Sequence, residues 1–300
     1  MSILMMLNLK GGVAKTTSAV AVAECLASQG FRTLLIDADH QCMAGELLLG
    51  ECRLLQCEKK GRTLHDLLAS MLDDEFRSDQ FEGTVTRRVS NIGGGLTKLA
   101  VLPCSIRIDD FSTNMAKARR GHSSNDEFLG MWNRRRQLMK RWVEENFDFA
   151  VIDCPPSLAL QVRFLLSVAD DVIVPTLPDR LSIRGSLFLL DRLRSHGYKV
   201  VTLGTLWSMV RARTVHDKFI EATRRGVDPL NRLPVPFQTA IPNATKIAES
   251  ADIETQKPRT FYQKYGEFAK LFESLCEEIV QKTQWRRTSQ QPKQPEAIAV

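Results

Sequence analysis

The sequence predicts an α/β fold of the doubly wound type, with a mostly parallel sheet flanked by helices. Short apolar runs alternate along the chain with segments that have helical spacing. The runs show little two-residue alternation, as expected for strands that are buried on both faces of a parallel sheet. Three hundred residues, of which 43% are hydrophobic and 25% charged, are sufficient for one large domain of this class.

Six apolar runs are predicted to be strands, because each ends close to a turn former or an acidic residue. In chain order they cover residues 3–7, 33–36, 99–102, 149–152, 172–174 and 200–203. Residues 18–28 carry an apolar stripe at helical spacing and are followed by Gly30, so we expect a helix there.

The remaining segments define the expected domain limits. Residues 112–127 are polar, and we expect a surface loop. Residues 261–282 have helical spacing and predict a packed terminal helix, whose acid-rich polar positions disfavour an anionic membrane surface. Residues 284–300 contain Gln and Pro but few large apolar groups, which favours a disordered tail. We therefore expect a single domain over residues 1–283.

Composition argues against several classes of protein. The apolar stretch 158–174 is interrupted by Arg163, Asp170 and Asp171, so no membrane-spanning helix is expected. No secretory signal precedes the first strand. The seven cysteines include no Cys-x-x-Cys pair and match no zinc spacing, which favours free thiols in a reducing, cytoplasmic setting.

The positive charge lies in the C-terminal part of the chain. The formal net charge is +6, with 21 Lys and Arg against 22 Asp and Glu in residues 1–175, and 20 against 13 in residues 176–300. A basic excess of this kind is compatible with binding to a polyanion. The alternative interpretation is a mixed, solvated surface.

The segment from Leu9 to Thr17 reads LKGGVAKTT and lies between a predicted strand and a predicted helix. In this setting, backbone N–H groups and a helix N-terminus bind phosphate. Glycines at positions 11 and 12 would let the backbone approach the phosphates, Lys15 would reach the β- and γ-phosphates, and the Thr16 hydroxyl would bind Mg²⁺. The standard pattern G-x-x-x-x-G-K-[ST] fails at positions 9 and 14, whereas K-G-G-x-x-K-T-[ST] matches. The alternative is a glycine-containing turn with incidental lysines.

Acidic residues follow two predicted strands. Asp37 and Asp39 come at the end of residues 33–36, and Asp153 follows the fully apolar run 149–152. Ligands of doubly wound sheets bind beyond the carboxyl ends of the strands, so these three acids are expected to converge on the glycine-containing loop. A single Asp after a strand is otherwise commonly a turn former or a helix cap.

Taken together, these segments resemble the ParA/MinD family of deviant Walker-A ATPases and, within it, the ParA-type partition ATPases. The resemblance extends from Met1 to about Lys282 and implies a P-loop NTPase fold of the deviant Walker-A type. Besides the loop, it rests on the family's Asp-x-Asp-Pro-Gln, Cys-Pro-Pro-Ser, Ala-Asp-x-Val-x-x-Pro, Thr-Met…Arg-Thr and Ile-Pro…Ala-Glu segments, which are similar to residues 35–41, 148–158, 169–175, 208–214 and 241–249.

The resemblance implies a slow, partner-stimulated ATPase with ATP and Mg²⁺ as ligands. Asp37 and Asp153 would support the Mg²⁺ ion together with Thr16, and Asp39 would position the attacking water. Lys10 would reach across an ATP-bound homodimer to the partner's nucleotide and, with Lys15, stabilise the transferring phosphoryl group. The implied nucleotide contacts are Gly11, Gly12, Val13, Ala14, Lys15, Thr16, Thr17, Met209 and Pro242.

Two residues depart from the family pattern. His40 stands where the family usually has Pro, and Ala14 where Gly is commonest. The Val13-Ala14 pair suits the deviant loop if residue 14 keeps a negative φ.

The leading functional hypothesis is an ATP-switched dimer that binds DNA without sequence preference and, associated with the nucleoid, positions plasmid or chromosomal cargo with a ParB-like partner. The candidate DNA contacts are Arg213, which matches a family position, and Arg192, Arg194 and Lys246. A positioner of a protein assembly remains an alternative. A MinD-like membrane-cycling protein would need a basic amphipathic C-terminal helix, and a metal-cluster carrier would need paired cysteines. The sequence offers neither, and no membrane partner is expected.

Overall fold

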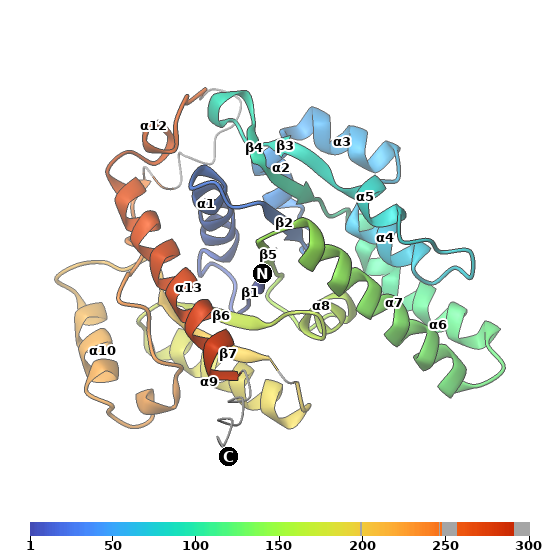
Figure 1. Cartoon of the computed structure of the whole chain (residues 1–300). Helices are drawn as coiled ribbons and strands as arrows, with labels where there is room; N and C mark the ends of the chain where they lie inside the picture. Colours follow the sequence, from blue (N-terminus) through green and yellow to red (C-terminus); the bar gives the residue numbers. More distant parts are fainter. Residues whose placement is uncertain (199, 246, 248–256, 291–300) are drawn as a thin grey trace, which may run out of the picture.

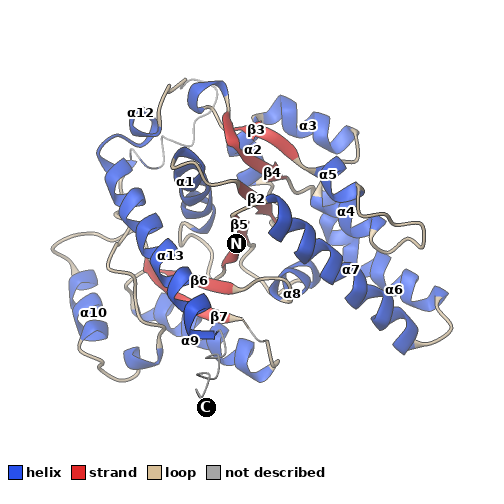
Figure 2. Ribbon diagram, viewed as in Figure 1, coloured by secondary structure: helices blue, strands red, loops and turns tan. Residues whose placement is uncertain are grey.

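The computed structural model describes residues 1–198, 200–245, 247 and 257–290. Over these residues the chain forms one seven-stranded sheet with helices on both faces (Figures 1 and 2). The strand order is β3-β4-β2-β5-β1-β6-β7, and every neighbouring pair is parallel except β3 and β4. The predicted doubly wound, mostly parallel fold is confirmed.

All six predicted strands are present, with ends that differ by up to four residues. The strands are β1 (Ser2–Met6), β2 (Thr33–Asp37), β3 (Thr86–Val89), β4 (Leu96–Leu102), β5 (Phe149–Asp153), β6 (Asp171–Thr176) and β7 (Val201–Trp207). Sequence reasoning missed β3 because it is an antiparallel edge strand with two exposed arginines, Arg87 and Arg88, and so lacks an apolar run.

The helices connect these strands. They are α1 (Lys15–Ser28), α2 (Met43–Leu49), α3 (Glu51–Lys59), α4 (Leu64–Ser70), α5 (Gln80–Thr84), α6 (Phe111–Gly121), α7 (Asn125–Asn146), α8 (Leu160–Leu166), α9 (Arg180–Ser195), α10 (Val215–Arg224), α12 (Phe261–Tyr265) and α13 (Ala269–Gln290). Short 3₁₀ helices η1 to η4 cover Ile92–Gly94, Ile106–Asp110, Leu230–Arg232 and Gly266–Phe268.

Two apolar cores lie on opposite faces of the sheet. Leu4 and Met6 of β1 pack with α1 and α13, whereas Ile3 and Met5 pack with α7, α8 and α9 on the other face. Because alternate residues of β1 are buried on both sides, its sequence shows no alternation of apolar and polar residues.

Several sequence-based expectations are wrong. Residues 112–127 do not form a loop but most of α6 and the start of α7, because Ala, Lys and Arg favour helix and the Ser124 hydroxyl caps α7. The disordered tail does not begin at residue 284, since α13 continues to Gln290. Residues 291–300 lie outside the described residues. The expected terminal helix is also divided, because Gly266 has φ 57° between α12 and α13.

A buried charge cluster fastens the terminal helices to α1. Glu24 of α1 is fully buried and accepts hydrogen bonds from Lys264 Nζ at 2.7 Å, Tyr265 Oη at 2.7 Å and Ser90 Oγ at 2.5 Å. Removing one partner of such a buried pair typically costs about 3–5 kcal/mol, because it leaves an uncompensated charge. The cluster therefore fixes α12 against the helix that begins at the glycine-containing loop.

None of the helices in the described ranges combines the length and the apolar content needed to cross a lipid bilayer.

Helix α1 begins at a residue in the left-handed region. Ala14, its N-cap, has φ 55° and ψ 35° and makes no side-chain capping hydrogen bond. The negative φ expected at this position is therefore wrong. An L-residue in this region is strained by about 1–2 kcal/mol, whereas glycine adopts it freely.

We expect Ala14→Gly to raise the free energy of unfolding by up to about 1 kcal/mol, because relief of the strain exceeds the extra chain entropy that glycine loses on folding. Urea unfolding followed by circular dichroism measures this change. The matched control is Ala23→Gly in the interior of α1, which should lower stability by about 1 kcal/mol. Equal destabilisation by both substitutions would contradict the left-handed conformation of Ala14.

Candidate nucleotide site

The register of the central strands brings two buried carboxylates side by side. Asp37, the last residue of β2, lies opposite Asp153, the last residue of β5, and Asp153 in turn lies opposite Met6 of β1. Neighbouring strands are about 4.8 Å apart, so the loop that follows β1 starts one strand spacing from Asp153 and two spacings from Asp37. The expected convergence of the strand ends is present.

The loop after β1 exposes backbone instead of side chains. Gly11 and Gly12 are exposed, Gly12 has φ 70°, and a Cβ at either position would have no atom within 4 Å. Helix α1 then begins with no side-chain cap and no acidic residue in its first turn. The first N–H groups of α1 therefore have no side-chain cap, and uncapped N–H groups at a helix N-terminus can bind phosphate.

The two lysines of the loop take different directions. Lys15 is 6% exposed, and its Nζ donates to the carbonyl oxygen of Lys10 at 3.0 Å, so it lies across the loop. Lys10 Nζ instead donates to Ser182 Oγ at 2.6 Å and lies 3.5 Å from Asp179 Oδ2, both at the start of α9. Burial lowers the pKa of Lys15, an effect that the Asp153 charge opposes.

Asp153 is a fully buried carboxylate with little compensation from the protein. Neither of its oxygens has a hydrogen-bond partner of normal geometry among the described residues, although the Thr16 hydroxyl lies close enough to lower its pKa. Burial, and after it the charge of Asp37, raise the pKa of Asp153 well above its ordinary value. Burial likewise raises the pKa of Asp37 to about 7. A divalent cation beside these carboxylates would favour their charged forms.

The residues present fit Mg²⁺ bound together with a nucleotide. Mg²⁺ usually keeps several waters and takes few protein ligands besides phosphate oxygens. Within the described residues, no group of three or more His, Cys, Asp or Glu is arranged to hold a metal ion by itself. Thr16 would supply a direct oxygen ligand, and Asp153 and Asp37 would accept hydrogen bonds from metal-bound water.

Gly45 is a site residue that sequence reasoning missed. Its N–H donates to Asp37 Oδ2 at 2.9 Å, while the Asp39 N–H donates to Asp37 Oδ1 at 3.1 Å. A Cβ at Gly45 would lie 3.1 Å from Pro103 Cβ, so only glycine fits without displacement. A glycine eight positions after an acidic strand end gives no distinctive signal in the sequence.

Asp39 is half-buried and stands at the mouth of the site. Its Oδ1 accepts from the Gln41 N–H at 3.1 Å. The same oxygen lies 3.6 Å from His40 Nδ1, which is also 3.9 Å from Asp109 Oδ1. Histidine is therefore accommodated at position 40, where its ring lies between two carboxylates.

The polar contacts that hold Lys10 were also missed. Asn8 Oδ1 accepts from the Lys10 N–H at 3.1 Å, and Asn8 Nδ2 donates to the Pro175 carbonyl at 2.6 Å. Asp179 caps α9 and accepts from Ser182 at both its N–H and its hydroxyl group. The Asp-x-x-Ser spacing at residues 179–182 is a capping signal that could have located this helix start.

Met209 and Pro242 lie on adjoining segments next to the loop. Val210 pairs with Pro242 as an isolated bridge, and the Val210 N–H donates to the Ile241 carbonyl at 3.0 Å. Ser208, which precedes Met209, donates from its Oγ to the Val13 carbonyl at 2.9 Å. This hydrogen bond connects the segment after β7 with the glycine-containing loop.

The candidate DNA contacts do not form one cluster. Arg192 and Arg194 are exposed in the last turn of α9, where the chain turns back into β7. Arg213 is exposed after the other end of β7, next to the start of α10. Because β7 runs between them, Arg192 and Arg194 lie towards the amino ends of the parallel strands, and Arg213 lies towards the carboxyl ends. Lys246 lies outside the described residues.

Comparisons with known proteins identify the family of the chain. Residues 1–196, more than half of the chain, match the family described as an AAA domain. The sporulation initiation inhibitor protein Soj of Bacillus subtilis is 27% identical over 91% of this chain and 95% of its own length. The chromosome-partitioning ATPase Soj of Treponema pallidum is 27% identical over 92% and 96%.

Solved structures show the same fold. The pNOB8 ParA structure superimposes with a TM-score of 0.67 at 18% identity, covering 95% of this chain and 99% of that one. An ATP complex of Cyanothece McdA gives 0.64 at 19% identity, with 93% and 96% covered. Cobyrinic acid a,c-diamide synthase from Mycobacterium smegmatis, with ADP and magnesium bound, gives 0.62 at 24% identity, with 96% of each chain covered.

The family match, the full-length likeness to the Soj proteins and the loop with its two lysines lead to one assignment. The chain belongs to this AAA-domain family and, within it, to the ParA-type partition ATPases of the deviant Walker-A class.

Proposed function

We propose that this ATPase is a dimerising switch that, in its ATP-bound state, binds DNA without sequence preference and positions plasmid or chromosomal cargo through a ParB-like partner. The observation that carries the proposal is that the side chains of the two loop lysines point in different directions. Lys15 Nζ lies across its own loop, whereas Lys10 Nζ points away from the loop and lies 2.6 Å from Ser182 Oγ at the start of α9. A second protomer's nucleotide gives Lys10 a role.

In the proposed nucleotide complex, the first N–H groups of α1 and Lys15 bind the phosphates. Mg²⁺, when bound, neutralises charge on the β- and γ-phosphates. The carboxylates of Asp37 and Asp153, whose pKa values burial raises, would be stabilised in their charged forms by the bound cation. The loop glycines allow this contact because no side chain occupies the open side of the backbone.

Hydrolysis needs a group that orients water towards the γ-phosphate. Asp39 is the acid that remains half-buried at the mouth of the site, since the Asx-type turn through Gln41 fixes its carboxylate. It can accept a hydrogen bond from the attacking water. Lys10 of a second protomer would then supply positive charge as phosphoryl transfer proceeds.

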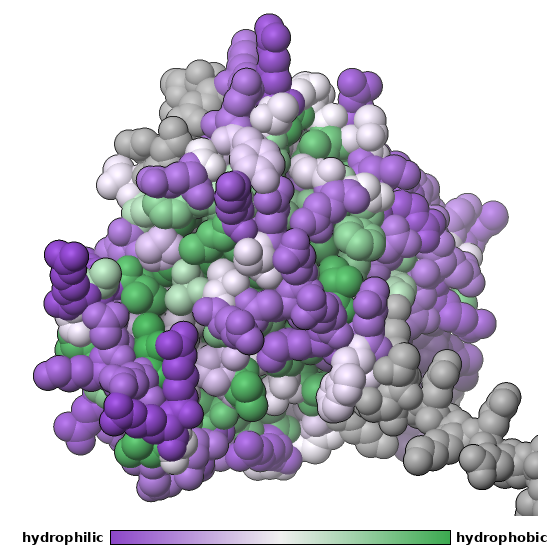
Figure 3. Space-filling view, turned by 60° about the vertical axis from the view of Figure 1, so that its left-hand side comes forward, coloured by the Kyte–Doolittle hydropathy of each residue, from purple (hydrophilic) through white to green (hydrophobic). Residues whose placement is uncertain are grey.

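In this proposal the DNA surface lies at the carboxyl ends of the parallel strands, on the same side of the molecule as the nucleotide site. Arg213 lies there, and so do Arg180 and Arg184 in the first two turns of α9, all three exposed. Helix α9 has 16 residues and is about 24 Å long, which separates these arginines from Arg192 and Arg194. The face turned forward in Figure 3 is largely hydrophilic, with hydrophobic residues in small patches.

We expect Lys15→Ala to abolish ATP binding, because the Lys15 ammonium group lies across the loop in which the phosphates are proposed to bind. Isothermal titration with ATP and Mg²⁺ measures the affinity. The control is Lys59→Ala, which removes an exposed lysine at the end of α3. An unchanged affinity in Lys15→Ala would remove the assignment of the loop.

We expect Lys10→Ala to retain nucleotide binding but to lose ATP-dependent dimerisation, because the lysine would act on the partner's nucleotide. Light scattering in ATP and ADP reports the mass, and phosphate release reports hydrolysis. Normal dimerisation and hydrolysis in this variant would show that Lys10 has no intermolecular role.

For DNA, we expect Arg184→Glu combined with Arg213→Glu to weaken binding on all sequences alike and to leave ATP binding intact. For every DNA phosphate that the protein no longer neutralises, the slope of log K against log salt should become shallower by about 0.9. Filter binding of random duplexes in ATP, ADP and no nucleotide, repeated across salt, gives both quantities. The matched control is Arg192→Glu with Arg194→Glu at the far end of α9.

If Arg192→Glu with Arg194→Glu weakened DNA binding and Arg184→Glu with Arg213→Glu did not, the DNA surface would lie at the amino ends of the strands. If the wild-type protein bound no DNA at low salt in ATP, positioning of a protein assembly would replace the DNA-based proposal.

A further inference from the structure

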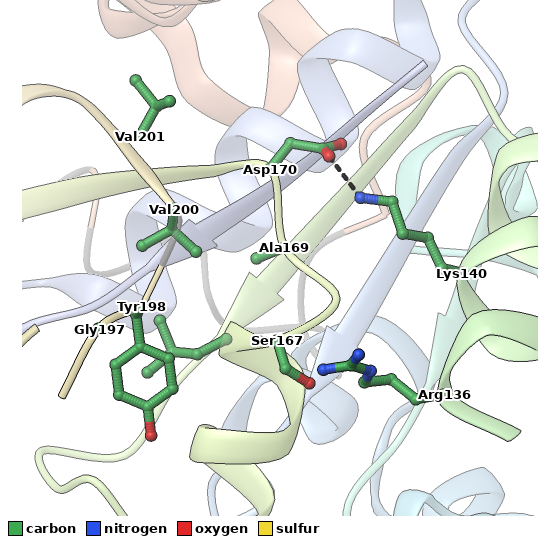
Figure 4. Close-up of a pocket in the computed structure, with 10 residues that line it drawn as sticks. Arg136, Lys140, Ser167, Ala169, Asp170, Gly197, Tyr198, Val200 and Val201 are labelled. Atoms are coloured by element: carbon green, nitrogen blue, oxygen red, sulfur yellow. Dashed lines mark hydrogen bonds and ion pairs between the residues drawn. The ribbon is translucent and has the colours of Figure 1, made fainter. Parts of the chain in front are cut away.

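A cavity of about 610 Å³ lies at the amino ends of the parallel strands, whereas the nucleotide site lies at their carboxyl ends. Its walls come from α7, the end of α8 and the segment that leads into β7 (Figure 4). Asp170 lines the cavity and directly precedes β6, whereas Thr176 ends β6 on the side of the sheet where the nucleotide site lies. A strand of six residues spans about 20 Å, so a molecule in this cavity could not contact the phosphate loop.

One positive charge in the cavity has no acidic partner. Arg136 of α7 is half-buried, and no acidic side chain within the described part of the chain forms an ion pair with it. Figure 4 shows its guanidinium group directed towards Ser167, with Tyr198 on the other side of the cavity. A half-buried guanidinium group presents donors that water satisfies only in part, and an anion would satisfy them better.

The second cation of the cavity is already compensated. Lys140 Nζ lies 2.7 Å from Asp170 Oδ1, and Asp170 Oδ2 accepts from the Ile3 N–H at 3.0 Å. The backbone of β1 thus holds this ion pair in place. Lys140 Nζ also lies 4.0 Å from Glu144 Oε1. Among the described lining residues only Arg136, Lys140 and Asp170 are charged, so their net charge is +1.

Apart from Ser167, the side chains of the other described lining residues are mainly apolar. Leu166, Val200 and Val201 line the cavity together with the ring of Tyr198, which stacks with the ring of His196 at a centroid distance of 6.3 Å. Small-molecule sites typically have volumes of about 300–1,000 Å³ and combine apolar walls with a few polar groups that fix orientation. The volume of this cavity lies within that range, and its walls combine apolar side chains with the charged groups of Arg136, Lys140 and Asp170.

We propose that this cavity binds a small organic monoanion with a flat apolar body, such as an aromatic carboxylate. The carboxylate pairs with Arg136 in bidentate geometry, and the apolar body packs against Leu166, Val200 and the Tyr198 ring. Because the site is remote from the phosphate loop, its ligand acts as an effector and not as a reactant. The inference does not depend on DNA binding or on dimerisation.

The test compares two probes of equal shape that differ in charge, 2-naphthoate and 2-naphthamide. Binding to the full-length protein is followed by ligand-observed NMR and isothermal titration. We expect 2-naphthoate to bind at least ten-fold more tightly than the amide. Arg136→Gln should weaken 2-naphthoate binding about ten-fold or more, as the loss of a charge-assisted hydrogen bond implies, and should leave the amide unaffected.

Two further variants fix the location. Asp170→Asn retains an oxygen for the Ile3 N–H but releases the charge of Lys140, so it should strengthen 2-naphthoate binding. Arg134→Gln removes an exposed arginine of the same helix that does not line the cavity, and should change nothing. Thermal unfolding of each variant verifies that it is folded.

The proposal fails if 2-naphthoate does not bind or if the amide binds equally well. It also fails if a folded Arg136→Gln protein keeps its affinity for 2-naphthoate, since the probe would then occupy another site.

Discussion

The structure depends on the parallel alignment of β1, β5 and β2 at the centre of the sheet. Their register places Asp153 between Met6 and Asp37, so two carboxylates lie buried at the point where the phosphate loop begins. Buried carboxylates are costly unless a cation or a hydrogen bond compensates them. Asp37 has two backbone donors, whereas Asp153 has Lys15 and the Thr16 hydroxyl as its nearest compensation. The site is therefore electrostatically incomplete without a ligand.

The surrounding structure holds this site in a fixed geometry from both faces of the sheet. On one face α1 runs from the phosphate loop to the buried Glu24 cluster, where Lys264 and Tyr265 join it to the terminal helices. On the other, the start of α9 holds Lys10 through Ser182. Ser208 adds a third contact by donating to the Val13 carbonyl. A nucleotide that reorders the loop would consequently act on the terminal helices, α9 and the region after β7 at once.

The two sides of the molecule at the carboxyl ends and at the amino ends of the parallel strands differ chemically. The carboxyl ends of the strands carry the nucleotide site, with exposed arginines at the start of α9 and before α10. The amino ends carry a cavity in which Arg136 is the one charged group among the described lining residues that forms no ion pair. The strand β6 connects the two sides, since Asp170 precedes it and α9 follows it. This arrangement offers a physical route between an effector and the nucleotide without requiring contact between them.

The sequence by itself determined the fold class, the central strands, the phosphate loop and the identity of its acids. These features are local, because buried parallel strands read as apolar runs and a phosphate loop needs a fixed spacing of Gly, Lys and Thr. Residues 112–127 and 284–290 do not follow the expectation, because polar segments without an apolar stripe give only a weak helix signal. Their helix propensity, the Ser124 cap and continuation of α13 nevertheless favour helix.

Only the tertiary structure decided which distant residues meet. It alone pairs Gly45 with Asp37, Lys10 with Ser182 and Glu24 with Lys264, over separations that no local pattern encodes. It likewise places Arg213 and Arg192 towards opposite ends of the parallel strands, although both belong to the same basic part of the sequence. The left-handed conformation of Ala14 is also tertiary, because an alanine does not adopt it without a loop held on both sides.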